Sequence, residues 1–298
     1  MTGAAGYIGG SVAAGLLQAG HEVLGLVRSA ERAARVRELG IEPVLGTLAD
    51  TGLLARLAGE ADAVINAASS EERGAVEAML DSLAGSGKAF LHTSGSSIVG
   101  DMAGGEPGDK VYDEETPIEP LPGRAGRVAI DRLVLASAKS GVRAVVLCPT
   151  MIYGPGRGAH RESIQVPRLI ELARKCGVAC HVGRGENIWS NVHIDDVVSL
   201  YLLALAKAPA GAFYFAENGE NSYREIAGAI SRMLGFGEGT RAMPIAESIA
   251  EFGEGAAQFS MGSNSRVRAV RARQELGWEP AGRPLLEEIE HGCYARRS

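Results

Sequence analysis

Short apolar runs alternate with longer amphipathic segments over the first 150 residues of this chain. Ile8, Val12 and Leu16 lie four residues apart, which predicts a helix over 9–18. Strands that alternate with helices indicate βαβ units and a parallel sheet. Near-continuous apolar strands further indicate that helices cover both faces of that sheet. The predicted strands are residues 21–27, 42–45, 63–67, 89–93 and 144–147.

The pattern becomes less regular after Pro149, where a glycine-rich turn covers residues 153–158. Strands and helices no longer alternate with a fixed rhythm beyond this point. We therefore expect residues 1–150 to form the core of the protein. Residues 151–298 are expected to form mostly a smaller lobe, with about 188–216 returning to the core.

Three glycines lie at the start of the chain in the spacing G-x-x-G-x-x-G. They are Gly3, Gly6 and Gly9, and a predicted helix and then a predicted strand follow them. In dinucleotide-binding loops the first glycine permits a tight turn, the second lets the backbone approach a pyrophosphate, and the third allows close helix packing. An ordinary glycine-rich turn is the alternative, and the βαβ context favours the phosphate-binding function. We predict an α/β protein with a doubly wound Rossmann-type parallel sheet and a smaller C-terminal substrate lobe.

The end of the next predicted strand bears on the choice of cofactor. An NAD-selective site places an acidic residue there to bind the ribose hydroxyls, but this chain has Val27, Arg28 and Ser29. A guanidinium beside a hydroxyl suits a 2′-phosphate, which Asp or Glu would repel. The sequence therefore predicts that Arg28 and Ser29 bind NADP(H) in preference to NAD(H). A solvated arginine before the next helix is the alternative.

Composition and charge exclude several other classes of protein. The 298 residues carry 30 Lys and Arg against 36 Asp and Glu, a formal net charge of −6, and only 5% are aromatic. This acidic balance disfavours a general nucleic-acid binder, which would show a basic face. No apolar run approaches the roughly 20 residues that span a bilayer, and four scattered cysteines do not indicate a disulfide framework. We expect a cytoplasmic protein that binds a small molecule, without nucleic-acid or membrane partners.

Six segments of the chain, taken in order, form a pattern that covers nearly its whole length. They are 3–9 (GAAGYIG), 66–69 (NAAS), 92–100 (HTSGSSIVG), 148–156 (CPTMIYGPG), 191–196 (NVHIDD) and 276–280 (LGWEP). The pattern resembles the extended short-chain dehydrogenases/reductases of the NAD-dependent epimerase/dehydratase type. The resemblance implies an adenine near Thr47 and Leu48 and a nicotinamide beside the backbone after Pro149. The residues for which it implies cofactor contacts are Tyr7, Ile8, Thr47, Leu48, Ala67, Ala68, Thr93, Pro149 and Met151.

The catalytic set that this family uses is altered in the chain. Such enzymes combine a serine or threonine with a tyrosine and a lysine spaced Y-x-x-x-K on one helix, where the cation lowers the pKa of the tyrosine. Gly123 stands at the tyrosine position and Arg127 at the lysine position, while the serine position falls on Gly95 among neighbouring serines. We predict that Arg127 contacts the cofactor or the substrate. A helix-surface arginine is the alternative.

Other residues are candidates for the missing proton donor. Ser96 adjoins the serine position, and Tyr112 lies in an irregular stretch before the Arg127 helix. Tyr153 follows the Pro149 turn and is a further candidate, although each tyrosine could equally be a surface or packed aromatic residue. We predict Ser96, Arg127 and Tyr112 as the catalytic residues.

Two clusters of metal-ligating residue types do not predict a metal site. The segment 176–181 has the spacing C-x-x-x-C-H but no second pair of ligands. For His193, Asp195 and Asp196 the resemblance implies a structural turn that opens a helix, with Asp195 or Asp196 as the capping carboxylate. We therefore expect no metal.

The sequence leaves three functions open. The first is an NADP(H)-dependent reductase or dehydrogenase of a small carbonyl or alcohol, and the second is a non-catalytic NADP(H)-binding sensor, which the altered catalytic set motivates. A sugar-nucleotide epimerase or dehydratase is the third, weakened because that chemistry also depends on the tyrosine. A second copy of the chain is a candidate partner through helices near 79–83 and 130–138, whose apolar stripes also suit core packing.

The glycine loop begins after only Met1 and Thr2. A dinucleotide-binding loop follows a strand, so we expect the first strand of the βα unit to be missing or truncated in this sequence. Without it, the neighbouring strands would be left with exposed edges.

Overall fold

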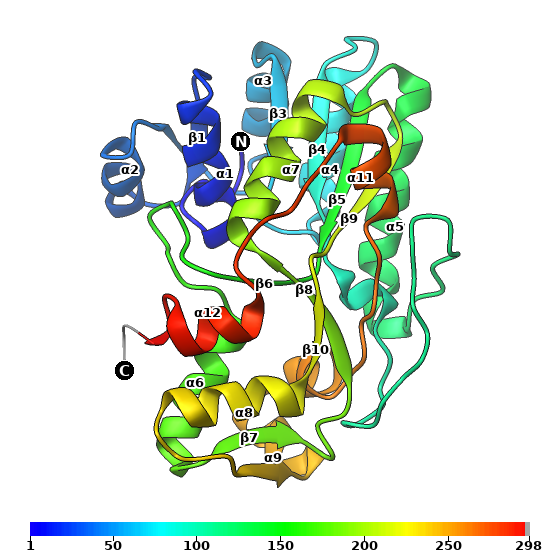
Figure 1. Ribbon diagram of the computed structural model, residues 1–298. Helices are drawn as coiled ribbons and strands as arrows, with labels where there is room; N and C mark the ends of the chain where they lie inside the picture. Colours follow the sequence, from blue (N-terminus) through cyan, green and yellow to red (C-terminus); the bar gives the residue numbers. More distant parts are fainter. Residues whose placement is uncertain (296–298) are drawn as a thin grey trace.

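The computed structural model describes residues 1–295, and its larger lobe contains two parallel sheets that lie side by side. Four strands lie in the order β3-β4-β5-β9, and two more form the pair β1-β2 (Figure 1). All neighbouring strands in both sheets run parallel. The bounds are β1 Leu24–Val27, β2 Glu42–Leu45, β3 Ala63–Asn66, β4 Ala89–Thr93, β5 Arg143–Pro149 and β9 Ala212–Ala216.

Helices cover these sheets, as the apolar runs predict. Every residue of β4 and β9 is buried, because strands covered on both faces present apolar side chains to helices on either side. Helix α1 packs on α7, while α4 packs on α3 and on α5. The bounds are α1 Tyr7–Gln18, α2 Ala30–Arg37, α3 Thr51–Glu60, α4 Arg73–Leu83, α5 Pro122–Ala136 and α7 Ile194–Lys207. The doubly wound α/β fold is therefore confirmed.

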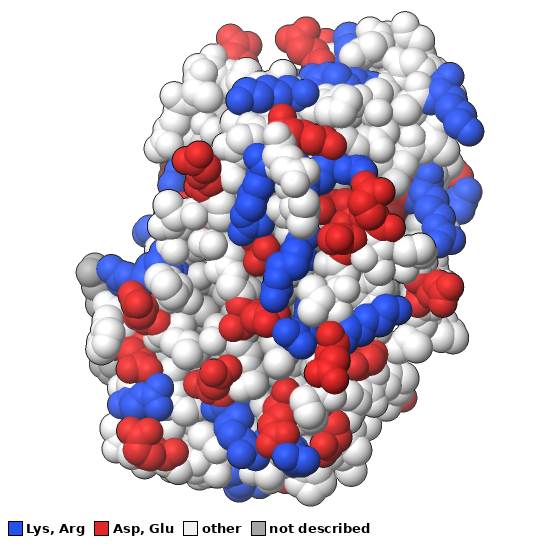
Figure 2. Space-filling model, turned by 45° about the vertical axis from the view of Figure 1, so that its right-hand side comes forward, with Lys and Arg blue, Asp and Glu red and all other residues white. Residues whose placement is uncertain are grey.

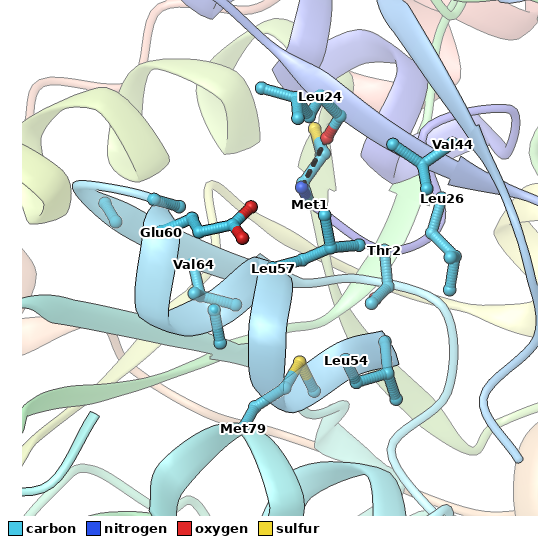
Figure 3. Close-up of a pocket in the computed structure, with 13 residues that line it drawn as sticks. Met1, Thr2, Leu24, Leu26, Val44, Leu54, Leu57, Glu60, Val64 and Met79 are labelled. Carbon is cyan, nitrogen blue, oxygen red and sulfur yellow. Dashed lines mark hydrogen bonds between the residues drawn. The ribbon is translucent and has the colours of Figure 1, made fainter. Parts of the chain in front are cut away.

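Met1 and Thr2 lie between the two sheets. The Leu26 amide donates to the carbonyl of Met1 at 2.9 Å, and the Thr2 amide donates to the carbonyl of Ile65 at 2.9 Å. Figure 3 shows the apolar pocket beside Met1, a cavity of about 120 Å³ between Leu24 on one side and Leu57 on the other. Met1 thus bonds to β1 and Thr2 bonds to β3, so these two residues link the two sheets.

The smaller lobe lies below the larger one in Figure 1 and has its own apolar core, which contains Trp189, Tyr223 and Met261. Two small sheets support it, with the strand orders β10-β8-β6 and β11-β7. The strands are β6 Met151–Tyr153, β7 Ala179–Val182, β8 Ile188–His193, β10 Glu220–Ser222 and β11 Thr240–Met243. The helices are α6 Gln165–Cys176, α8 Tyr223–Met233, α9 Ile245–Phe252, α10 Glu254–Ala256 and α12 Leu285–His291.

A second stretch of the C-terminal half also belongs to the larger lobe. Beyond α7 and β9, the larger core takes in Val267, Ala269 and Trp278, together with helix α11 (Val270–Leu276), which packs on β9 and α7. The Trp278 ring nitrogen donates to the carbonyl of Asp196 at 3.0 Å. The sequence predicted residues 151–298 to form mostly the smaller lobe, with about 188–216 returning to the core, and did not single out this stretch.

Charged side chains are mixed over the surface seen in Figure 2, where basic and acidic residues adjoin one another. Within residues 1–295, no helix combines the length and apolar character that crossing a membrane would require.

Candidate functional site

The glycine loop is packed too tightly for side chains at two of its three glycines. Gly3 has φ +71°, and a β-carbon there would lie 2.5 Å from the carbonyl oxygen of Ala67. A β-carbon on Gly9 would lie 2.2 Å from the carbonyl oxygen of Gly3. The side-chain oxygen of Thr2 accepts hydrogen bonds from the amides of Ala67 and Ala68 at 3.1 and 3.2 Å. The loop is therefore pressed against the end of β3, while Gly6 faces an adjoining cavity.

That cavity, which we call the glycine-loop cavity, has a volume of about 540 Å³. It collects residues from the ends of β1, β2 and β3, the edge at which ligands bind in open parallel sheets. Two residues that the sequence analysis missed, Arg32 and Glu72, also line it. The predicted cofactor residues in its wall are Gly3, Gly6, Arg28, Thr47, Leu48, Ala67 and Ala68.

Arg32 lies on the first turn of α2, and Ser29 fixes this turn. The Ser29 hydroxyl accepts a hydrogen bond from the Arg32 amide at 3.3 Å and so caps the helix. Ser29 itself does not line the glycine-loop cavity, whereas Arg28 and Arg32 do. A serine three residues before Arg32, of the type that often caps a helix, was the sequence signal that could have identified Arg32.

Several other predicted cofactor residues lie outside that cavity. The Tyr7 hydroxyl donates to the carbonyl of Gly154 at 2.8 Å, and the Thr93 hydroxyl bonds the Tyr201 hydroxyl at 2.6 Å. Ile8 and Gly9 lie in α1. Met151 is fully buried in the core of the smaller lobe. Met151 thus fills the lobe core, because β6 turns it away from the sheet edge.

A second cavity, which we call the inter-lobe cavity, opens where β4 and β5 end. It has a volume of about 350 Å³ and lies between the larger lobe and residues 255–261 of the smaller one. Ser96, Arg127 and Pro149 all line it, so the structure brings these three predicted residues together. Ser96 is buried, and its hydroxyl accepts a hydrogen bond from the Ser265 hydroxyl at 3.0 Å.

The Arg127 guanidinium is fixed between two partners. It donates to the Ser97 hydroxyl at 3.1 Å and forms an ion pair with Glu71 at 2.7 Å. Gly95 lies directly beneath it, where a β-carbon would be 3.4 Å from the guanidinium. Glu71 follows β3 and Arg127 is on α5, so this ion pair links the segment after β3 to helix α5.

The tyrosine position of the resembled family is occupied differently here. A β-carbon on Gly123 would lie 3.1 Å from the Phe259 ring, so that ring fills the space beside the helix. Tyr112 does not line either cavity. Its backbone pairs with Arg266 and Arg268, and Lys110 covers its ring at 4.4 Å. Tyr153 is buried and donates to the carbonyl of Arg283 at 2.8 Å.

A buried polar network lies beneath the inter-lobe cavity, and the sequence analysis did not identify it. Asp131 accepts a hydrogen bond from the Ser94 hydroxyl at 2.6 Å, and Asn66 donates to Nδ1 of His92 at 3.0 Å. Nε2 of His92 and Oδ1 of Asp131 lie 3.6 Å apart, too far for a hydrogen bond. Polar residues inside an otherwise apolar strand and helix were the available signal.

Burial shifts the two ionisable groups of this network in opposite senses. It raises the pKa of Asp131 to about 6, although the Ser94 hydrogen bond and the charge of Arg127 oppose the rise. It lowers the pKa of His92 to about 4, and Arg127 adds to that effect. Between these values both groups are neutral, so the pair is not an ion pair in that range.

These shifts predict a specific pH dependence of stability for Asp131→Asn. As pH rises from about 4 to 6, the raised pKa of Asp131 makes the fold less stable, because the unfolded chain releases this proton first. Over a similar range the lowered pKa of His92 makes the fold more stable. Asp131→Asn removes only the first effect. Over this pH range we therefore expect the free energy of unfolding of the variant to rise by on the order of 2 kcal/mol more than that of the unsubstituted chain.

Urea unfolding at pH 4.5 and pH 6.5 measures this difference. Asp81→Asn removes a carboxylate from the exposed face of α4 and is the matched control. We expect the control to follow the unsubstituted chain. Parallel stability curves for Asp131→Asn and the unsubstituted chain would show that the network does not titrate in this way.

The two clusters of ligand-type residues have structural partners. Within residues 1–295, no group of three or more His, Cys, Asp or Glu side chains is arranged to hold a metal ion. His193 caps α7 by accepting from the Asp195 amide at 3.2 Å. The cap is thus the histidine and not a carboxylate, because Asp196 turns toward the amides of Ala281 and Gly282.

Comparison with known proteins supplies the relatives of this chain. The sequence model of the NAD dependent epimerase/dehydratase family matches residues 1–214. An oxidase of Acremonium sp. is 33% identical, over 97% of this chain and 94% of its own length. A farnesyl-dihydroquinoline-oxide ketoreductase of Stigmatella aurantiaca is 30% identical, over 74% of this chain and 67% of its own. The crystal structure of a Streptomyces venezuelae dTDP-glucose 4,6-dehydratase with NAD bound matches with a TM-score of 0.78 and 22% identity. The match covers 99% of this chain and 95% of the dehydratase chain.

Proposed function

Because this chain belongs to the NAD-dependent epimerase/dehydratase family, we propose that it is an NADP(H)-dependent reductase of a small carbonyl compound. An oxidoreductase assignment agrees with relatives that include an oxidase and a ketoreductase. Preference for the phosphorylated cofactor and reduction of a carbonyl are the finer parts of the proposal. They rest on the residues of the two cavities.

The glycine-loop cavity fits a dinucleotide. The backbone beside Gly3 and Gly6 is open where a pyrophosphate would need close approach, since no side chain covers it. The exposed side chains of Arg28 and Arg32 line the same cavity, and neither forms an ion pair within residues 1–295. Two unpaired guanidinium groups suit a 2′-phosphate. Glu72 is the one acidic side chain among the residues that line the cavity.

The observation that carries the reductase proposal is the position of the inter-lobe cavity next to the glycine-loop cavity. The inter-lobe cavity opens at the ends of β4 and β5, and the glycine-loop cavity opens at the ends of β1, β2 and β3. Strands β3 and β4 are neighbours in the sheet. A protein that only sensed the cofactor would have no need of the inter-lobe cavity, which has room for a small second molecule.

NADPH, when bound, supplies the hydride that the carbonyl carbon accepts. The Ser96 hydroxyl, at the cavity wall, would donate a hydrogen bond to the carbonyl oxygen, and solvent would supply the proton through it. Arg127 is held by Glu71 and Ser97. Its fixed positive charge would stabilise the negative charge that develops on that oxygen. No tyrosine is required in this scheme, in agreement with the packing of Phe259 against Gly123.

A sensor without catalysis is the second candidate, and the same packing of Phe259 against Gly123 favours it. An epimerase or dehydratase is less well supported, because the family chemistry that the resemblance implies needs the tyrosine base. The sensor predicts tight NADPH binding without consumption of NADPH.

NADPH consumption, followed by absorbance with a panel of aldehydes, ketones, quinones and imines, tests the proposal. We expect consumption with at least one carbonyl class, and faster consumption of NADPH than of NADH. Tight NADPH binding without consumption in the presence of any class, together with capture of a partner protein, would instead favour the sensor.

A further inference from the structure

The inter-lobe cavity contains three arginines and no acidic side chain. Arg124 and Arg127 come from the start of α5, and Arg168 comes from the first turn of α6 on the opposite lobe. Concentrating like charge in one cavity is unfavourable unless something neutralises it. In a chain with a net charge of −6, this local excess of positive charge needs an explanation.

Only one of the three guanidinium groups is neutralised within the described part of the chain. Arg127 pairs with Glu71 at 2.7 Å. Among residues 1–295, no carboxylate lies within ion-pair distance of Arg124 or Arg168. Neither of these two guanidinium groups therefore forms an ion pair there. The more distant charge of Glu71 acts on Arg124, and the exposed Arg168 also lines a neighbouring hollow with Glu171 and Glu251.

Arg124 is held in place by an aromatic ring and not by an anion. Its guanidinium carbon lies 4.6 Å from the centre of the Phe259 ring. Its Nε is buried without a hydrogen-bond partner among residues 1–295, and a long contact of 3.4 Å joins its guanidinium to the carbonyl of Gly123. Burial and the neighbouring charge of Arg127 lower the pKa of Arg124, and the charge of Glu71 opposes this effect. Its hydrogen-bonding capacity is thus largely unused, although the group is pre-positioned at the cavity wall.

We infer that the substrate carries an anionic group, a carboxylate or a phosphate monoester, which Arg124 and Arg168 bind from opposite sides of the inter-lobe cavity. The guanidinium fork matches both of these planar or tetrahedral oxyanions. Because the two arginines come from different lobes, the anion would also bridge the lobes and orient the carbonyl toward Ser96. This inference rests on the proposed function for the presence of a carbonyl, but not for the charge of the ligand.

Binding to the protein loaded with NADP⁺ separates the two claims, because no reduction can occur. The probes are 4-carboxybenzaldehyde, 4-formylphenyl phosphate and methyl 4-formylbenzoate, which has a similar size to the first and no charge. We expect the ester to bind at least about tenfold more weakly than the better of the two anions, since a charge-assisted hydrogen bond contributes roughly that factor or more. Whichever anion binds more tightly identifies the oxyanion.

Single replacements test the residues. Arg124→Gln and Arg168→Gln are each expected to weaken binding of the better anion by about tenfold, with little change for the ester. Lys175→Gln removes a positive charge from the same helix as Arg168, outside the cavity, and is the charge control. Thermal unfolding of each variant shows whether it is folded, and Arg124→Met replaces Arg124→Gln if that variant is not.

Equal binding of the ester and both anions by the unsubstituted protein would overturn the inference. So would equal losses for charged and uncharged probes in the two glutamine variants. Selective anion binding without consumption of NADPH would leave the inference intact and contradict the reductase proposal. Consumption of NADPH without any preference for the charged probes would support the reductase proposal and contradict the inference.

Discussion

Replacing Arg28 and Arg32 together with alanine is expected to weaken NADPH binding about a hundredfold and NADH binding only slightly. Each guanidinium lines the glycine-loop cavity without an ion-pair partner in residues 1–295. A hydrogen bond between charged groups contributes roughly 1.5–3 kcal/mol, so two such contacts to a 2′-phosphate account for this loss. NADH lacks that phosphate and should be insensitive to the change.

Fluorescence titration of both reduced cofactors measures the effect. Arg35→Ala is the matched control, because Arg35 lies on the same helix and pairs with Glu31 on an exposed surface. The control should retain the affinity of the unsubstituted chain for NADPH. NADH binding as tightly as NADPH to the unsubstituted chain would contradict the assigned cofactor preference.

Ser96→Ala is expected to lower kcat for carbonyl reduction by roughly a hundredfold, as general acid–base groups typically contribute about 10²–10⁴. The fold should tolerate the change. The Ser265 hydroxyl lies 3.0 Å from the Ser96 hydroxyl and also donates to the backbone carbonyl of residue 96 at 2.8 Å. In the alanine variant this carbonyl is still present to accept that hydrogen bond. NADPH affinity should therefore stay close to that of the unsubstituted chain.

Steady-state kinetics measures this loss, with a carbonyl compound that the unsubstituted protein reduces as the substrate. Ser82→Ala is the control, because the Ser82 hydroxyl donates to the carbonyl of Ala55 between α4 and α3, and neither residue lines the two cavities. An unchanged kcat in Ser96→Ala would remove Ser96 from the mechanism, and the proton would then have to come directly from solvent.

The larger lobe was predictable because its signals are local. Hydrophobic periodicity identified β2 and β4 with their observed bounds, and the glycine spacing identified the turn before α1. Arg28 was a predicted cofactor residue because it ends a strand, whereas Thr47 and Ala67 were implied by the family resemblance. All three line the glycine-loop cavity, because strand ends meet at one edge of a parallel sheet.

The rest depends on contacts between distant segments. Nothing near Gly123 in the sequence indicates that Phe259 fills the adjoining space. The return of Trp278 to the larger core depends on its hydrogen bond to Asp196, 82 residues earlier. The cavity that unites Arg124 with Arg168 forms only when the two lobes meet. Tertiary packing, and not local pattern, decides such positions.

The central claim is that this chain transfers hydride from NADPH to a carbonyl carbon, and isotope transfer tests it most directly. NADPH deuterated at C4 of the nicotinamide, in each of its two stereochemical forms, is incubated with the enzyme and a carbonyl substrate. We predict that mass spectrometry will find deuterium on the carbinol carbon of the alcohol product with one of the two forms. Consumption of NADPH with no deuterium in the product from either form, or tight NADPH binding with no product at all, would contradict the account.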